Sequence, residues 1–236
     1  MPASPVIINS DVALNAFATT LTTSVNLVED GDTVFLWAGS DSGQIITGVT
    51  TAGLTWSLRK GITTSGSGNN NAACSLWWTT IPIGSGITDV VALATFSGEY
   101  DASGGIAFNV RGWASTGPFD NNVALPLGWS GNPPGTEDYS TNQNDDLLIY
   151  CRGGEEVDPL GGVPAGWTKE NFVANSGGFG FFGGVLAYRS VSAPQSAIPF
   201  NDDTNSSGFS CFLIDAVTSD IVTGRSQRPF LIRPSR

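Results

Sequence analysis

The chain has 236 residues, a formal net charge of −11 and no histidine. A Ser-His-Asp triad, a Cys-His dyad and a His-ligated zinc site are excluded, because each of them requires an imidazole. The acidic balance disfavours nucleic-acid binding, which depends on Lys and Arg. Only 13% of the residues are charged, about half the usual share, and this composition indicates a β-rich structural or binding protein rather than an enzyme.

The N-terminal segment lacks the basic region and the apolar run of a secretory signal, and no stretch is long and apolar enough for a membrane span. Residues 11–18, DVALNAFA, are the best helix candidate, with room for two turns. Elsewhere, short apolar or alternating runs between Gly, Asn, Ser and Pro predict β-strands. The predicted strands cover residues 33–39, 44–50, 55–60, 73–80, 89–96, 105–110, 147–152, 168–174, 184–190, 197–200 and 209–217.

Blocks of similar sequence recur in the same order in the two halves of the chain. GDTVFLWAG (31–39), GLTWSLRK (53–60), SLWWTTIPIG (75–84) and GGIAFNVRG (104–112) match NDDLLIYCRG (144–153), AGWTKEN (165–171), VLAYRSVSAP (185–194) and GFSCFLIDA (208–216). A four-stranded unit with one apolar face cannot bury that face alone. The repeat therefore predicts an internal duplication in which two units stack into a single jelly-roll-like β-sandwich of about eight or more strands.

We expect one domain over residues 1–224, with repeat halves at about 25–112 and 144–217. Two separate domains are the alternative, but each of them would need two packed sheets of its own. Residues 113–143 are rich in Gly, Pro and Asn, so we expect them to form a long surface connector. The cysteines Cys74, Cys151 and Cys211 are odd in number and widely spaced, which favours buried thiols over one disulfide and a free thiol.

Residues 225–236 contain no acidic residue and four arginines, whereas all 21 acidic residues lie before them. Proline and glycine disfavour a helix here, so we predict an extended basic C-terminal arm that docks on a neighbouring acidic copy or adds a strand to its sheet edge. A frayed terminus is the alternative. The expected partner-binding residues are Arg225, Arg228, Phe230, Leu231, Ile232, Arg233 and Arg236.

Aromatic residues form two groups with different expected roles. Trp56 and Trp167 occupy matching repeat positions, as do Trp78 and Tyr188, and such positions are typical of a core. Trp77 and Trp78 must face opposite ways on a strand, so we expect one of them to point away from the core. The connector carries Trp113, Trp129 and Tyr139; these residues either pin the loop or form a glycan-binding surface, where a flat apolar face suits a sugar ring.

The acidic residues cluster in turns before strands, as in Asp145-Asp146, where Asp commonly bonds its own backbone. No pair has a pattern that indicates glycosidase carboxylates, and we predict no catalytic residue. We expect no cofactor and no fixed-spacing metal site, with calcium as the one ion that acidic turns leave open.

The duplicated order of these motifs resembles a group of Gly/Thr-rich β-sandwich proteins from tailed bacteriophage virions and bacterial surfaces. The resemblance rests on GDTVFLWAG, GLTWSLRK and SLWWTTIPIG, with NDDLLIY, PAGWTKE and VLAYRSVSAP in the second half, and covers about residues 25–217. It implies a non-enzymatic virion structural protein that decorates a head or belongs to a fibre, collar or tail. The implied partners are virion proteins and copies of itself, with no nucleic acid and no membrane. A carbohydrate-binding or host-adhesion module is the alternative.

Overall fold

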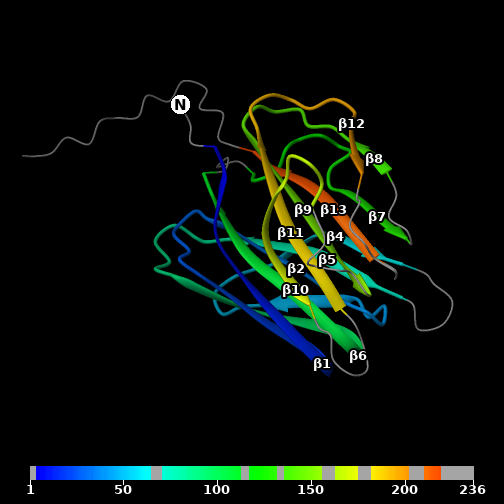
Figure 1. Cartoon of the computed structure of the whole chain (residues 1–236). Coiled ribbons are helices and arrows are strands. Elements are labelled where there is room, and N and C mark those ends of the chain that lie inside the picture. Colours follow the sequence, from blue (N-terminus) through cyan, green and yellow to red (C-terminus); the bar gives the residue numbers. More distant parts are fainter. Residues whose placement is uncertain are drawn as a thin grey trace, which may run out of the picture.

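The structure, a computed structural model, describes residues 4–64, 71–112, 117–131, 136–155, 163–174, 182–201 and 210–218. These residues form antiparallel β-sheets and no helix, so none of them belongs to a helix that could span a membrane. The predicted all-β sandwich is confirmed. Its two main sheets and a short ribbon appear in Figure 1.

Each main sheet takes its strands from one half of the chain. Sheet I has the order β1-β6-β2-β5-β4, with β3 paired to β6, and sheet II has the order β10-β11-β9-β13-β7. Sheet I comprises β1 (Val6–Asn26), β2 (Thr33–Ser40), β3 (Ile46–Thr50), β4 (Ser57–Thr63), β5 (Ala73–Thr80) and β6 (Asp89–Arg111). Sheet II comprises β7 (Leu127–Gly131), β9 (Asp146–Glu155), β10 (Thr168–Ala174), β11 (Phe182–Val191) and β13 (Ser210–Val217). The ribbon pairs β8 (Thr136–Tyr139) with β12 (Ile198–Asn201).

The strand order of the two sheets is the same when it is written by position along each half. Sheet I contains the order β6-β2-β5-β4, and sheet II contains the order β13-β9-β11-β10. If the four strands that carry the repeat blocks are numbered along each half, both sheets have the order 4-1-3-2. A Greek key has the order 4-1-2-3, and jelly rolls are built from Greek keys. The jelly-roll connectivity that we expected is therefore not seen in the described strands, whereas the matching order is what a duplicated unit would produce.

The matched tryptophans agree with this correspondence. Trp56 directly precedes Ser57, which pairs with Trp78, and Trp167 directly precedes Thr168, which pairs with Tyr188. Both strands also have a register irregularity at the same place, after Leu58 in β4 and after Lys169 in β10.

The fourth repeat block was aligned wrongly from the sequence. Phe35 in β2 pairs with Phe108, and the matching residue in β9, Ile149, pairs with Asp215. The comparison of the two repeat blocks aligned Phe108 with Phe212 instead of with Asp215. A three-residue shift moves a side chain to the other face of a strand, and Phe212 does lie on the outer face of sheet II, away from the central core.

Three apolar cores hold the layers together. The central core lies between the sheets and joins Phe35, Trp37 and Phe108 to the inner side chains of β9, β11 and β13. The second core lies on the outer face of sheet I, and the third on the outer face of sheet II under the β8–β12 ribbon. Trp77 belongs to the second core and Trp78 packs against the central one. The two side chains face opposite ways as expected, but neither points away from a core, because sheet I is covered on both faces.

Strand β1 replaces the predicted helix at residues 11–18. Asp11 through Ala16 pair with β6, and the pairing resumes at Thr20 after an irregularity near Ala18. Beyond that point Leu21 and Val25 enter the second core, so one long strand pair contributes to two layers (Figure 1). Cross-strand pairing thus overrides the local helical pattern of DVALNAFA.

The connector 113–143 is not a structureless excursion. It contains β7, which pairs with β13, and β8, which pairs with β12. These strands are short and contain Gly, Ser and acidic residues, so they carry little of the apolar alternation that marks a strand in sequence. All three cysteines are buried and free, as the thiol interpretation predicted.

Candidate functional site

The sequence-predicted binding residues divide into those that the structure describes and those that it does not. The whole arm, residues 225–236, and Trp113 lie outside the described residues. Trp129 and Tyr139 lie within them, on β7 and β8. The proposed partner-binding and glycan-binding roles therefore remain predictions, but the surroundings of Trp129 and Tyr139 can be given.

Neither aromatic side chain stands free on a surface. The ring of Trp129 is half-buried and stacks on Phe212 with ring centroids 5.7 Å apart and an interplanar angle of 25°. Tyr139 is 2% exposed, and its ring meets the ring of Trp167 edge-on at 6.4 Å. Both side chains pack with the third core, which is the loop-pinning role that the sequence left open.

A cavity of about 290 Å³ opens beside Tyr139. Its walls include Trp167 and Phe200, and the half-buried Arg189 adds a cation. The Tyr139 hydroxyl is buried and has no hydrogen-bond partner among the described residues. Burial raises the pKa of Tyr139, and the guanidinium of Arg189 partly offsets that rise. Aromatic walls, an unpaired hydroxyl and a guanidinium together suit a small ligand that has an apolar face and an acidic group.

Sequence reasoning missed Arg189 and assigned Trp167 to the core. Trp167 is 9% exposed and does pack in the third core, so its interpretation as a core residue was sound. Its second role as a cavity wall depends on the β8–β12 ribbon, which brings Tyr139 and Phe200 to the same place. No local pattern in the sequence indicates that meeting.

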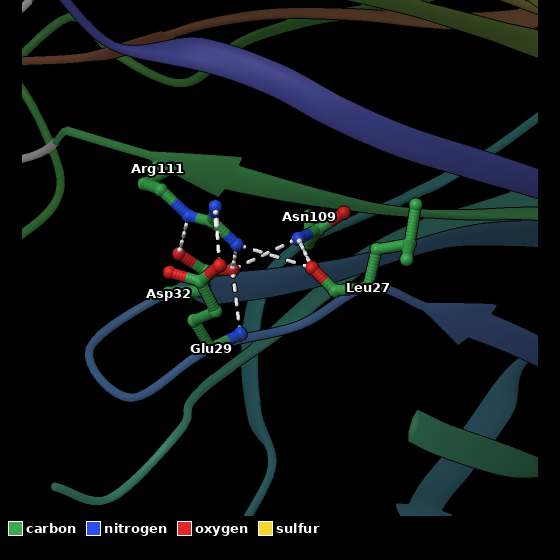
Figure 2. Close-up of polar contacts among 5 residues, drawn as sticks. All are labelled: Leu27, Glu29, Asp32, Asn109 and Arg111. Atoms are coloured by element: carbon green, nitrogen blue, oxygen red, sulfur yellow. Dashed lines mark hydrogen bonds and ion pairs between the residues drawn. The ribbon is translucent and has the colours of Figure 1, made fainter. Parts of the chain in front are cut away.

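A polar network closes the end of sheet I where β2 begins and β6 ends, as Figure 2 shows. Asp32 is 1% exposed, yet its carboxylate is fully engaged. Arg111 donates from Nε to Oδ1 at 2.8 Å and from Nη2 to Oδ2 at 2.9 Å. The Asn109 side-chain amide and the Glu29 backbone N–H also donate to Oδ2, each at 2.9 Å.

Arg111 is shared among several acceptors in this network. Its Nη1 forms an ion pair with Glu29 Oε1 at 3.0 Å, and its Nη2 donates to the Leu27 carbonyl at 3.1 Å. The hydrogen bond with Asp32 raises the pKa of Arg111 above its usual value. The buried negative charge at the start of β2 is thus paired with a fixed positive charge, the arrangement that a buried carboxylate needs.

The matching place in sheet II holds a different arrangement. Thr33 pairs with Val110, and Leu147 pairs with Val217, so Asp32 corresponds to Asp146 and Arg111 to Thr218. Asp146 is 1% exposed, and neither of its carboxylate oxygens has a hydrogen-bond partner among the described residues. Burial raises the pKa of Asp146 to about 7, and the negative charge of Asp120 adds to the rise.

Asp120 is the second carboxylate of this site, and it is 4% exposed. Its Oδ1 accepts the Asn122 N–H at 2.7 Å, and its Oδ2 accepts the N–H groups of Asn142 and Gln143 at 2.9 Å and 2.8 Å. The Asp120 N–H donates to the Ala216 carbonyl at 3.0 Å, which fixes this loop beside the end of β13. Two carboxyl groups from different segments therefore share one buried place.

The described residues contain no group of three or more His, Cys, Asp or Glu side chains placed to hold a metal ion. The sequence had marked Asp145-Asp146 as an acidic turn but gave no reason to pair Asp146 with Asp120. Their meeting depends on the connector, which runs back along β13 through the Phe119–Val217 bridge.

The outer edge of β1, which is an edge strand of sheet I, is a further candidate binding surface. No described strand pairs with it, and Asp11 is the one charged residue in its 21 residues. Val12, Leu14 and Phe17 are 38%, 42% and 55% exposed. Such an edge is open to another strand, because its backbone donors and acceptors have no partner in the sheet.

Comparison of the chain with protein-family models, with curated proteins and with solved structures gives no match. The resemblance to bacteriophage sandwich proteins stays a prediction.

Proposed function

We propose that this protein is a non-enzymatic structural protein of a bacteriophage virion, where it binds copies of itself and neighbouring virion proteins. The observation that carries the proposal is the unpaired edge of β1 with its exposed apolar side chains. Natural β-proteins protect long edges with lysine, proline or a covering segment. The 21-residue β1 has no lysine and no proline, so its edge is suited to pairing rather than to solvent.

The arm at residues 225–236 of a neighbouring copy is the occupant that we propose for this edge. Its Phe230-Leu231-Ile232 segment has the apolar, β-favouring character of an added strand. Its four arginines complement the acidic body, and Asp11 on β1 and the nearby Glu170, whose Oε1 accepts from the Ser10 hydroxyl at 3.2 Å, provide negative charge at the edge. Twelve extended residues span up to about 40 Å, which is long enough to reach between copies.

Size-exclusion chromatography with light scattering tests the assembly proposal. The full chain is expected to form oligomers that dissociate in a variant ending at residue 224. Leu14→Lys should weaken assembly in the same way, while Val123→Lys, at a side chain that is 100% exposed on a loop, should not. A full chain that stays monomeric, or a shortened chain that assembles equally well, contradicts the proposal. Capsid or tail genes beside its gene support the virion role, and metabolic genes on both sides oppose it.

The cavity beside Tyr139 favours a second candidate, a carbohydrate-binding or host-adhesion module. Its aromatic walls suit a sugar ring, and Arg189 suits a carboxylate on that sugar. Sialyllactose and its neutral counterpart lactose are suitable probes in a calorimetric titration. Binding of sialyllactose that is lost in Arg189→Ala supports this function, whereas the absence of binding to either sugar removes it. Because Val123 does not line the cavity, Val123→Lys is a suitable control here too.

A further inference from the structure

The Asp120–Asp146 pair concentrates negative charge in a buried place that contains no described cation. No described Lys or Arg forms a salt bridge with either carboxylate. The Arg59 guanidinium lies 3.9 Å from the ring centroid of Phe119, the residue before Asp120, but Asp215 holds it through two hydrogen bonds of 2.7 Å and 3.0 Å. Burying a carboxylate without a partner is costly, so this pair calls for a proton or a positive ion.

Asp146 distinguishes this pair from an ordinary acidic turn. The three backbone N–H groups around Asp120 satisfy that carboxylate as an anion. Asp146 is 1% exposed and receives no hydrogen bond at either oxygen from the described residues. The side chains of Thr141 and Thr218 lie beside Asp146, and their hydroxyl groups lower its pKa against the rise that burial causes. The Thr141 hydroxyl accepts the Gln195 N–H at 3.0 Å, and the Thr218 hydroxyl donates to Gln143 Oε1 at 3.0 Å. The neighbours of the Asp146 carboxylate are therefore hydroxyl and carboxylate oxygens, and no described Lys or Arg forms a salt bridge with it.

The other half of the molecule shows what this position requires. Asp32 occupies the corresponding place in sheet I, and there Arg111 supplies the positive charge through two hydrogen bonds. Thr218 stands where Arg111 would be, so the side chain at that position cannot provide a charge. A neutral hydroxyl oxygen stands at the position that matches the Arg111 guanidinium, and a hydroxyl oxygen can coordinate a metal ion.

We propose that Asp120 and Asp146 bind one calcium ion, with the hydroxyl oxygens of Thr141 and Thr218 as neighbouring ligands and water completing its coordination. Calcium accepts oxygen ligands in irregular geometry, whereas magnesium demands a near-ideal octahedron and gives up water reluctantly. Zinc prefers nitrogen and sulfur ligands, and the chain has no histidine. Two carboxylates indicate a weak site, with a dissociation constant of about 0.1–1 mM.

Calorimetric titration and thermal unfolding of the full chain test the site after EDTA treatment and desalting. We expect one calcium ion per chain and a rise in melting temperature of about 3–8 °C at about 10 mM CaCl₂. MgCl₂ at the same concentration should give a smaller rise. Asp146→Asn, which keeps the shape of the side chain, should abolish the calcium response. Asp138→Asn makes the same chemical change at an exposed residue of β8 and should keep it.

Thr218→Arg provides a second test, because it introduces the residue found at the matching place in sheet I. We expect its melting temperature to be higher without calcium and its calcium response to be lost. The proposal is overturned if the unaltered chain shows no calcium-dependent rise, which would mean that a proton alone balances the pair. A rise that persists in full in Asp146→Asn also overturns it, because the ion then binds elsewhere.

Discussion

The two main sheets solve the same electrostatic problem differently. Each main sheet places a buried aspartate where its first repeat strand begins, Asp32 in sheet I and Asp146 in sheet II. Asp32 receives four hydrogen bonds, two of them from the guanidinium of Arg111. Asp146 receives none from the described residues and lies beside a second carboxylate, Asp120.

This difference shows that matching backbone positions in the two sheets do not require the same side-chain chemistry. The strand pairing that brings residue 32 next to residue 111 also brings residue 146 next to residue 218. The fold therefore creates a place where one cation is needed, and the side chains decide where that cation comes from. In sheet I the cation is part of the chain. In sheet II, we propose that it comes from solution.

Removing the cation from the Asp32 site of sheet I should cause the largest loss of stability. Arg111→Ala leaves Asp32 buried with its main partner gone, and breaking such a pair costs about 3–4 kcal/mol. The value lies toward the lower end of the usual range because the Arg111 side chain is 33% exposed. Urea unfolding followed by tryptophan fluorescence measures the loss.

Thr218→Ala is the matched change in sheet II, and we expect it to cost less than about 1 kcal/mol, since it removes one hydroxyl and no charge. Equal losses for Arg111→Ala and Thr218→Ala would show that the two sites do not differ electrostatically.

Removing the anchored carboxylate of the second site should have an intermediate effect. Asp120→Ala leaves the N–H groups of Asn122, Asn142 and Gln143 without their acceptor, and unsatisfied buried donors are expensive. We expect a loss of about 2–3 kcal/mol in the same urea experiment, because relief of repulsion with Asp146 offsets part of the cost. A stabilised Asp120→Ala protein would mean that repulsion outweighs these hydrogen bonds.

The sequence was sufficient for the parts of the fold that depend on local pattern. Apolar alternation marked most strands of both sheets, and the order of the repeat blocks matched Trp56 with Trp167 correctly. It failed where long-range pairing dominates. Residues 11–18 carry a spacing compatible with helix, but β6 supplies strand partners for residues 11–16 and 18. The weakly apolar β7 and β8 were missed, because their pairing partners lie more than fifty residues away.

The candidate sites were less accessible to sequence reasoning than the fold. The glycan interpretation chose Tyr139 because connector aromatics were expected to be exposed, but the ribbon buries it against Trp167. The Asp120–Asp146 pair joins a connector loop to the start of β9, and no spacing rule links such positions. The sequence did allow one comparison, that of Asp32 with Asp146. Each of them stands at the start of the first repeat strand of its half, in the GD and DD turns.

A pH dependence at the second site is predicted to be smaller than the losses from Arg111→Ala and Asp120→Ala. The ordinary pKa of an aspartate is 3.8, the value expected for Asp146 in the unfolded chain, and folding raises it to about 7. Between these values the folded state binds more protons than the unfolded state, so stability should fall as pH rises from about 4 to 7 in the presence of EDTA. We expect a fall on the order of 1–2 kcal/mol, because the neighbouring Asp120 carboxylate contributes to the same local field.

Asp146→Asn isolates this contribution, because the amide keeps the shape and cannot ionise. Its stability in EDTA should lack the fall assigned to Asp146, so that at pH 8 it exceeds that of the unaltered protein. Calcium should act in the opposite sense: a bound ion requires the ionised carboxylate, so its stabilising effect should grow as pH rises through about 7. Urea unfolding at a series of pH values, with EDTA and with CaCl₂, separates the two effects. The same pH profile in EDTA for Asp146→Asn and the unaltered protein would contradict the prediction. It would mean that Asp146 is ionised in the folded protein at neutral pH and that a positive charge of the chain itself stabilises it.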